Sequence, residues 1–275
     1  MTTVRAWVVR SPVTAFYILT LLLSWGYWLT LLARGVQVGV GTSAASFLGL
    51  MGPLLAAIAV TWITSGSPGI ADLASRTVRL PRPRLRSVLL AVSPLITGAV
   101  IFGALRLLGH PLPPAATFTQ FASLPWGWAI PVVLGLTVLN GFGEEVGWRG
   151  FATPHLLARF GRFRATLIVG GLWVLWHAPL FALNAGMHAM WGRPVMLGWA
   201  FSLMCGAFVL ASLYLNCSQS ILVVAVWHAT FNMVVSTEAG TGTPAAVVST
   251  VVMVWGVAVA LWWWRSEWIA RSRLT

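Results

Sequence analysis

Two adjacent acidic residues, Glu144 and Glu145, stand near the end of an apolar run of the chain. A charged side chain near the centre of a bilayer costs roughly 2.5–3.5 kcal/mol on insertion scales, so such residues rarely lack a role. Arg149 follows Glu145 by four residues, one helical turn, which predicts an ion pair and a supporting role for both. Glu144 is then left without a local partner. An unpaired carboxylate of this kind can act as the general base that activates water.

Two histidines lie inside later apolar runs, His177 in one and His228 in another. Asn232 follows His228 by four residues and therefore shares its helix face. Taken singly, each histidine is explained equally well as a hydrogen-bonded packing residue. Because polar groups in lipid must find partners, we expect Glu144, His177, His228 and Asn232 to converge in one cavity.

Such a set supports two kinds of hydrolytic chemistry. In one, Glu144, His177 and His228 bind a divalent metal such as zinc, with water as the open ligand. In the other there is no metal: Glu144 and His177 activate water, while His228 and Asn232 stabilise the developing oxyanion. Both lead to hydrolysis of an amide bond inside the membrane, and the choice between zinc and no cofactor stays open.

Three short motifs carry these residues, in order along the chain. Residues 144–149 read EExxxR, residues 173–177 (WVLWH) read aromatic-xxxH, and residues 228–232 (HATFN) read HxxxN. Over about residues 127–236 the ordered set resembles the type II CAAX prenyl protease and bacteriocin-processing (CPBP, Abi) family of intramembrane proteases. The resemblance implies an intramembrane endopeptidase whose substrate is a membrane-embedded or lipid-anchored peptide.

The resemblance also implies a role for each matched position. Glu144 would activate water with His177 as its partner, and His228 and Asn232 would stabilise the oxyanion or complete a metal site. Glu145 and Arg149 would support the site. Trp173 stands where the family often has Phe; the aromatic character is kept, so we expect a change in pocket shape rather than in chemistry.

The composition indicates a membrane protein. The chain is 58% hydrophobic and only 8% charged, which is too few charges for the surface of a water-soluble domain of 275 residues. We therefore expect an all-α, polytopic membrane bundle, with residues 1–275 as a single integral membrane domain and residues 127–236 as its catalytic core. About eight apolar segments are long enough to span a bilayer, at about 13–33, 44–64, 87–108, 127–146, 166–184, 195–215, 219–236 and 245–264.

The net charge of +12 comes from seventeen arginines, which cluster between the apolar runs. We interpret them as a topology signal rather than a nucleic-acid-binding face. When the segments are assigned alternately to two sides, one side receives fourteen arginines and the other only Arg34, Arg106 and Arg193. Because positive residues stay inside, we expect both termini to be cytoplasmic, in a multi-pass protein of the cell (inner or plasma) membrane.

The depth of the site follows from the same segments. His177 and His228 each lie about ten residues, roughly 15 Å, from the cytoplasmic end of their run, which predicts a cavity that opens toward the cytoplasm. For Glu144 to reach the histidines, the fourth segment must continue past Arg149.

Two other functions fit the same residues. Intramembrane Glu and His also form proton relays, as in a proton- or metal-coupled transporter, although the two halves of the chain show no repeat. A non-catalytic membrane scaffold or immunity protein would keep the motifs and bind a partner. Other intramembrane proteases fit less well, because the chain has neither an HExxH nor a GxSG motif and Asp72 is its only aspartate.

Overall fold

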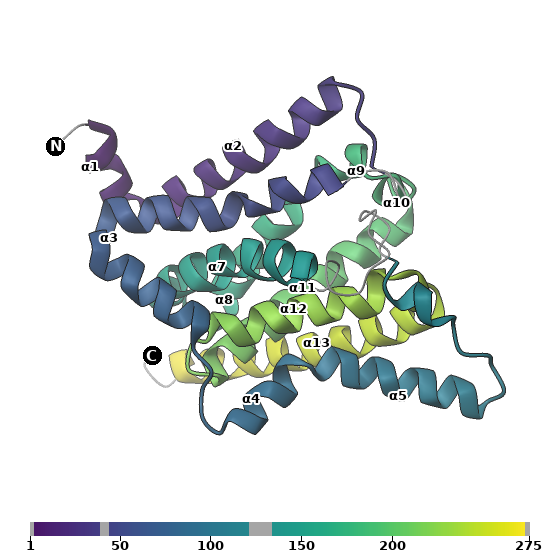
Figure 1. The fold of residues 1–275 in the computed structure, drawn as a ribbon. Helices are drawn as coiled ribbons and strands as arrows, with labels where there is room; N and C mark the ends of the chain where they lie inside the picture. Colours follow the sequence, from purple (N-terminus) through teal and green to yellow (C-terminus); the bar gives the residue numbers. More distant parts are fainter. Residues whose placement is uncertain (1–2, 39–43, 121–133, 273–275) are drawn as a thin grey trace.

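The structure is a computed structural model, and it describes residues 3–38, 44–120 and 134–272 (Figure 1). Over these ranges every named element is a helix, which confirms the all-α prediction. The first residues of the predicted core, 127–133, lie outside the described residues. The elements are α1 (Thr3–Arg10), α2 (Pro12–Ala33), η1 (Ala44–Met51), α3 (Gly52–Val78), α4 (Arg84–Ala91), α5 (Ser93–Leu107), η2 (Ala115–Phe118), η3 (Leu136–Phe142), α7 (Gly143–Gly147), η4 (Trp148–Ala152), α8 (Thr153–Trp176), α9 (Leu180–Leu183), α10 (Ala185–His188), α11 (Pro194–Asn216), α12 (Ile221–Ser236), η5 (Glu238–Gly240) and α13 (Thr243–Ser272).

Several helical stretches are long and apolar enough to cross a membrane. Within the described residues there are five: Pro12–Ala33, Ser46–Val78, Leu136–Leu183, Pro194–Asn216 and Thr243–Ala270. The pair α4 and α5, bent by 58°, adds a sixth if it forms one span, and α12 is a shorter apolar helix. All eight predicted segments overlap helices, but the count of about eight spans stays a prediction.

The predicted fourth and fifth spans fall in one helical stretch that is divided at Gly161. Gly161 has φ 77° and ψ 177°, a backbone conformation that residues with a Cβ rarely adopt. The helix breaks at this glycine. The chain folds back at this break, because Trp173 after it hydrogen-bonds Glu144 before it. The helical stretch continues past Arg149. This is the extension that we predicted Glu144 needs in order to lie at the depth of His177.

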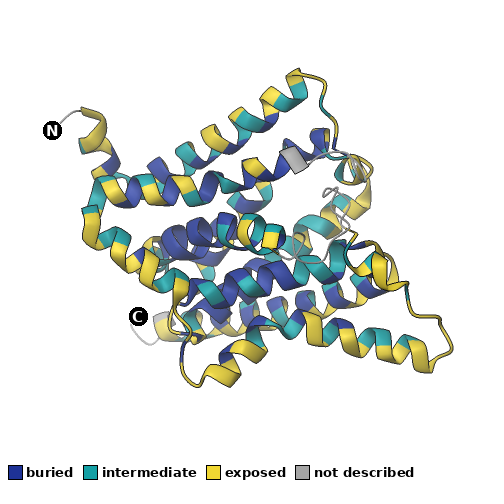
Figure 2. Cartoon of the chain, viewed as in Figure 1, coloured by how far each residue is buried: buried dark blue, intermediate teal, exposed yellow. Residues whose placement is uncertain are grey.

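The helices pack around a buried centre. α3 contacts α2 and α7, α12 contacts η3 and α5, and α11 contacts α8 and α13. Figure 2 shows α7 and α12 largely buried, whereas the outer helices expose many large apolar side chains, among them Leu22, Trp62 and Val254. Apolar side chains facing outward suit contact with lipid rather than water. The chain is a multi-pass membrane protein.

The bundle has an end rich in arginine. The end of α3 contacts the turn between α11 and α12, where Arg79 Nη1 donates to the carbonyl of Ser218 at 3.1 Å. The turn after Gly161 contacts the last part of α13, where the Phe163 amide donates to Glu267 Oε1 at 3.0 Å. We call this the arginine-rich end, on the left in Figure 1, and its described arginines are Arg5, Arg10, Arg76, Arg79, Arg82, Arg84, Arg86, Arg159, Arg162, Arg164 and Arg265.

The opposite end of the bundle carries few arginines. There the segment after α2 contacts α9 and α10, with the Val38 amide donating to the Leu183 carbonyl at 2.8 Å. The described arginines near this end are Arg34, Arg106 and Arg193. We call it the arginine-poor end. Both α1 and the last turns of α13 lie at the arginine-rich end (Figure 1), and their placement in the cytoplasm stays a prediction.

Candidate active site

The acidic pair lies on α7, a short α-helical segment between the π-helical segments η3 and η4. Such π-helical turns are uncommon and occur often at functional sites. A Cβ added at Gly147 would lie 2.7 Å from the carbonyl carbon of Pro53, and one at Gly143 would lie 3.1 Å from the Leu50 carbonyl oxygen. The four-residue spacing of these glycines therefore lets α7 lie directly against the end of η1 and the start of α3.

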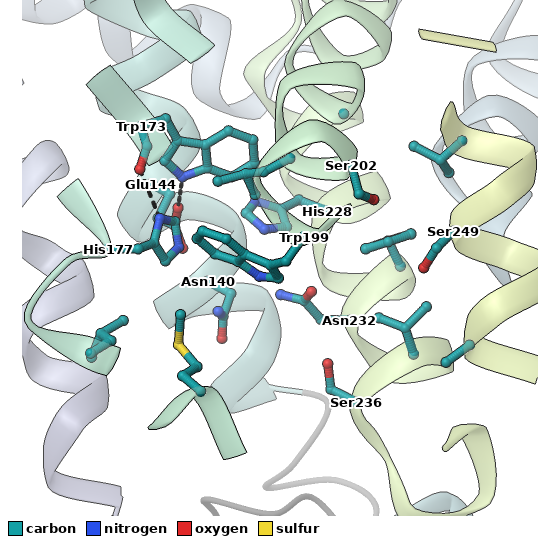
Figure 3. Close-up of a pocket in the computed structure, with 18 of the residues that line it drawn as sticks. Asn140, Glu144, Trp173, His177, Trp199, Ser202, His228, Asn232, Ser236 and Ser249 are labelled. Atoms are coloured by element: carbon teal, nitrogen blue, oxygen red, sulfur yellow. Dashed lines mark hydrogen bonds between the residues drawn. The ribbon is translucent and has the colours of Figure 1, made fainter. Parts of the chain in front are cut away.

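Glu144 is buried and held by an indole. Its Oε2 accepts a hydrogen bond of 2.6 Å from Nε1 of Trp173, on α8 (Figure 3). A phenylalanine at this position would have no donor to offer. Trp173 thus contacts the carboxylate directly, a role that sequence analysis, which expected only a change in pocket shape, did not predict.

Glu145 is also buried, and one of its oxygens serves two partners. Oε1 accepts from Arg149 Nη1 at 2.9 Å, which confirms the predicted ion pair. The same atom lies 2.9 Å from Nδ1 of His228, on α12. A carboxylate on one ring nitrogen fixes the tautomer and orientation of a histidine and leaves Nε2 for other partners. Glu145 therefore positions His228 in addition to pairing with Arg149.

His177 stands at the end of α8. Its Nδ1 lies 2.8 Å from the carbonyl oxygen of Trp173, and because a carbonyl only accepts, the proton must be on Nδ1 (Figure 3). Nε2 is then the free nitrogen of the neutral ring. No hydrogen bond joins His177 to Glu144 within the described part of the chain, so their partnership stays a prediction.

The four predicted reacting residues meet in one cavity of about 810 Å³. Glu144, His177, His228 and Asn232 all line it, from α7, the end of α8 and α12 (Figure 3). The predicted convergence is therefore observed, while the chemical role of each residue stays a prediction.

Asn140 lines the same cavity, and sequence analysis did not single it out. Its Oδ1 is buried and has no hydrogen-bond partner among the described residues. The signal was present in the sequence, since Asn140 precedes Glu144 by four residues, one helical turn. Ser202, Ser236 and Ser249 also line the cavity, but they come from three helices and form no motif.

The cavity extends toward the arginine-poor end. α13 contributes only residues 245–253 to its lining and α12 only residues from Trp227 onward, and both sets lie in the halves nearer that end. Toward the arginine-rich end, Trp148 and Phe151 are packed in the core. The described lining thus runs toward the arginine-poor end, and the predicted opening toward the cytoplasm stays a prediction. Both histidines lie near the middle of their segments, so depth alone did not distinguish the two ends.

The metal hypothesis needs a cluster of ligands. Within the described residues, no group of three or more His, Cys, Asp and Glu side chains is arranged to hold a metal ion. Glu144 Oε2 and both Nδ1 atoms are also bonded to protein partners. Whether Glu144, His177 and His228 hold a metal through their remaining oxygen and nitrogen atoms stays a prediction, and we derive no step through one.

Comparison with known proteins finds matches to the segment that carries the motifs. Residues 125–234 match the family described as type II CAAX prenyl endopeptidase Rce1-like, and this range contains every predicted site residue. CAAX prenyl protease 2 of Methanococcus maripaludis is 31% identical over 104 residues. That alignment covers 37% of this chain and 38% of the relative, so the chain matches under two fifths of the relative's length. Residues 125–234 are therefore similar to type II CAAX prenyl endopeptidases of the Rce1-like family.

Proposed function

We propose that the chain is an intramembrane endopeptidase that hydrolyses a peptide bond in a membrane- or lipid-anchored peptide or protein. The observation that carries the proposal is the meeting of Glu144, His177, His228 and Asn232 around one cavity inside an apolar helical bundle. The family match and the name of the relative, a prenyl protease, support the same reaction class. The membrane we propose is the cell membrane.

The first step is the activation of water. A carboxylate accepts through two oxygens, and the Trp173 indole occupies only Oε2 of Glu144. The second oxygen takes a proton from water that Nε2 of His177 helps to hold. The water oxygen then forms a bond to the carbonyl carbon of the substrate, whose oxygen becomes negative.

The second step is the collapse of the tetrahedral intermediate. The Asn232 amide and Nε2 of His228 lie on one face of α12 and donate to the oxyanion. Donation by Nε2 requires a protonated ring, and the Glu145 carboxylate on Nδ1 balances that charge. The carbon–nitrogen bond breaks, and the proton held by Glu144 passes to the leaving nitrogen.

The test compares the membrane peptides of cells that carry the intact chain with those of cells that carry Glu144→Ala. We expect an uncleaved membrane peptide to accumulate in the variant and its two fragments to disappear, as measured by mass spectrometry. The matched control is Glu238→Ala, which removes an exposed carboxylate that does not line the cavity.

An unchanged set of peptide termini in Glu144→Ala cells, with the variant present at normal level, would contradict the proposal. It would favour the transporter or the scaffold, because neither function creates new peptide ends.

A further inference from the structure

Asn140 brings to the cavity a polar group that the fold itself does not use. It stands in η3, one helical turn before Glu144, and both residues line the cavity. Its Oδ1 is buried and accepts no hydrogen bond within the described part of the chain. A buried acceptor without a donor destabilises a fold, so its presence points to a task other than holding the helices together.

Asn140 and Asn232 lie at the same level of the bundle. η3 and α7 pack against α12 and run toward the arginine-rich end, whereas α12 begins at that end (Figure 1). The contact of Glu145 Oε1 with His228 Nδ1, at 2.9 Å, marks one level of these antiparallel helices. Asn140 lies five residues before Glu145, through the wide π-helical end of η3, and Asn232 lies four residues after His228. Both amides are therefore about one helical turn from that contact, in the same direction.

A side-chain amide is the chemical complement of a peptide group. It offers a carbonyl acceptor and an NH₂ donor, as the backbone offers one C=O and one N–H. Much of the cavity lining is apolar, as at Leu203, Phe231 and Met253. A peptide that enters such surroundings must pair its backbone groups with the few neutral polar side chains that it meets.

The other asparagines of the described lining already have tasks. Oδ1 of Asn184 accepts from the backbone amide of Met187 at 3.2 Å, at the start of α10. Asn232 is the residue to which we assign the oxyanion. The Asn140 amide is thus the one whose acceptor is free for the backbone of a bound peptide.

We propose that Asn140 binds the backbone of the cleaved peptide, with Oδ1 accepting from an N–H close to the scissile bond. The bound molecule being a cleaved peptide rests on the proposed function. Rotation of the amide about its Cβ–Cγ bond, a torsion with a broad energy profile, presents Oδ1 to the peptide. One helical turn, about 5.4 Å, separates Asn140 from Glu144, and an extended peptide rises about 3.3 Å per residue. The N–H that Asn140 holds is therefore roughly one or two residues from the scissile bond.

The first test asks whether Asn140 serves the fold or a ligand. Asn140→Leu keeps the size of the side chain and removes its amide. Because Oδ1 has no partner in the fold, we expect the free energy of unfolding in detergent micelles to stay equal or to rise. The matched control is Asn184→Leu, which removes the acceptor of the Met187 amide and should lower that free energy. A loss of stability in Asn140→Leu as large as in Asn184→Leu would overturn the proposal.

The second test locates the hydrogen bond on the peptide. The probe is a synthetic peptide that spans the bond identified by comparing intact and Glu144→Ala cells, together with analogues in which an ester replaces one backbone amide and so removes one N–H. We expect an ester one or two residues from the scissile bond to lower kcat/KM of the intact chain about three- to tenfold, the effect of one hydrogen bond. Asn140→Leu should cleave the unmodified peptide more slowly by the same factor, and that ester should then cost nothing further.

The outcomes separate this proposal from the proposed function. If Asn140→Leu cleaves at the rate of the intact chain, or if every ester has the same effect in both chains, Asn140 does not bind the backbone, while the peptidase stands. Binding of the same peptides to Glu144→Gln, with and without Asn140→Leu, gives the converse. Affinity that depends on both Asn140 and one N–H, without cleavage by the intact chain, would contradict the proposed function and support Asn140 as the residue that binds the backbone.

Discussion

Glu144 and Glu145 are neighbours in the chain but contact different helices. Successive residues of an α-helix point about 100° apart, since a turn has about 3.6 residues. Glu144 consequently reaches Trp173 on α8, while Glu145 reaches His228 on α12. The pair thus connects both histidine-bearing helices to α7, and each carboxylate has its own task.

The indole of Trp173 positions the carboxylate that we propose as the base. Trp173→Phe keeps the ring and removes the hydrogen bond to Glu144 Oε2. A hydrogen bond to a charged group contributes about 1.5–3 kcal/mol, so we expect kcat to fall about tenfold or more. The measurement is the cleavage rate of the purified variant. Trp264→Phe, at an exposed position of α13, is the control, and equal rates for Trp173→Phe and the intact chain would refute this role.

The ion pair of Arg149 and Glu145 is fully buried. Arg149→Leu would leave the buried Glu145 carboxylate without its arginine partner, and the expected loss in free energy of unfolding is about 3–5 kcal/mol. The loss is measured by comparing the free energies of unfolding of the variant and the intact chain in detergent micelles. Adding Glu145→Gln to Arg149→Leu should restore part of the stability, because the uncompensated charge is gone. A single variant as stable as the intact chain would show that the pair does not stabilise the fold.

The spacing of residues along the chain predicted the contact between Arg149 and Glu145, but it did not predict the contact between Glu145 and His228. Arg149 follows Glu145 by one helical turn, so their pairing needed no knowledge of the fold. The contact of His228 with Glu145 rather than Glu144 depends on the rotation of α7 about its axis. That rotation follows from the π-helical turns on either side of α7 and from packing on α3, which the sequence pattern does not give.

At the scale of elements, α7 is held by close contacts of the glycines in it and just before it. Gly143 contacts the end of η1 and Gly147 the start of α3. Gly141, in η3, lies against Ala225 of α12, where an added Cβ would be 2.6 Å from the carbonyl oxygen. These contacts fix the depth and rotation of the acidic pair. The sequence indicated close packing through the spacing of Gly143 and Gly147, but it did not identify the partner helices.

Gly147→Ala tests this packing. The added methyl would meet the backbone of Pro53, which cannot turn aside as a side chain can. We expect the free energy of unfolding to fall by about 1–3 kcal/mol and cleavage to decline with it. Gly26→Ala on α2 is the matched control, because no atom lies within 4 Å of the Cβ it would add. Equal losses in both variants would show that the contact between α7 and α3 is not the cause.

The break at Gly161 is a second feature of this scale. The apolar pattern predicted two separate spans around it, and the structure shows helix almost up to the break on both sides. Only the positive φ of one glycine marks the turn. A glycine inside a helical pattern predicts neither a helix break nor a reversal of the chain direction. The hydrogen bond between Glu144 and Trp173, which depends on that reversal, could therefore not be predicted.

At the scale of the molecule, composition and apolar runs predicted an all-α membrane protein, because burial in lipid constrains every residue of a span. The arginine pattern divided the chain into two ends, and contacts such as that of Phe163 with Glu267 bring arginine-bearing segments together at one of them. The depth of the histidines predicted a cavity that opens toward the cytoplasm, but it did not identify which residues line the cavity. That lining depends on how the helices pack, a property that no single segment carries.

The central claim is that Glu144 is the base of a peptidase. The most direct measurement is the cleavage rate of the purified chain, reconstituted in lipid vesicles, on the peptide that accumulates in the Glu144→Ala cells. General acid–base catalysis contributes about 10²–10⁴-fold to rates. Glu144→Gln should therefore cleave at least about a hundredfold more slowly, while its free energy of unfolding equals that of the intact chain. If Glu144→Gln cleaves that peptide at the rate of the intact chain, Glu144 is not the base and the account is contradicted.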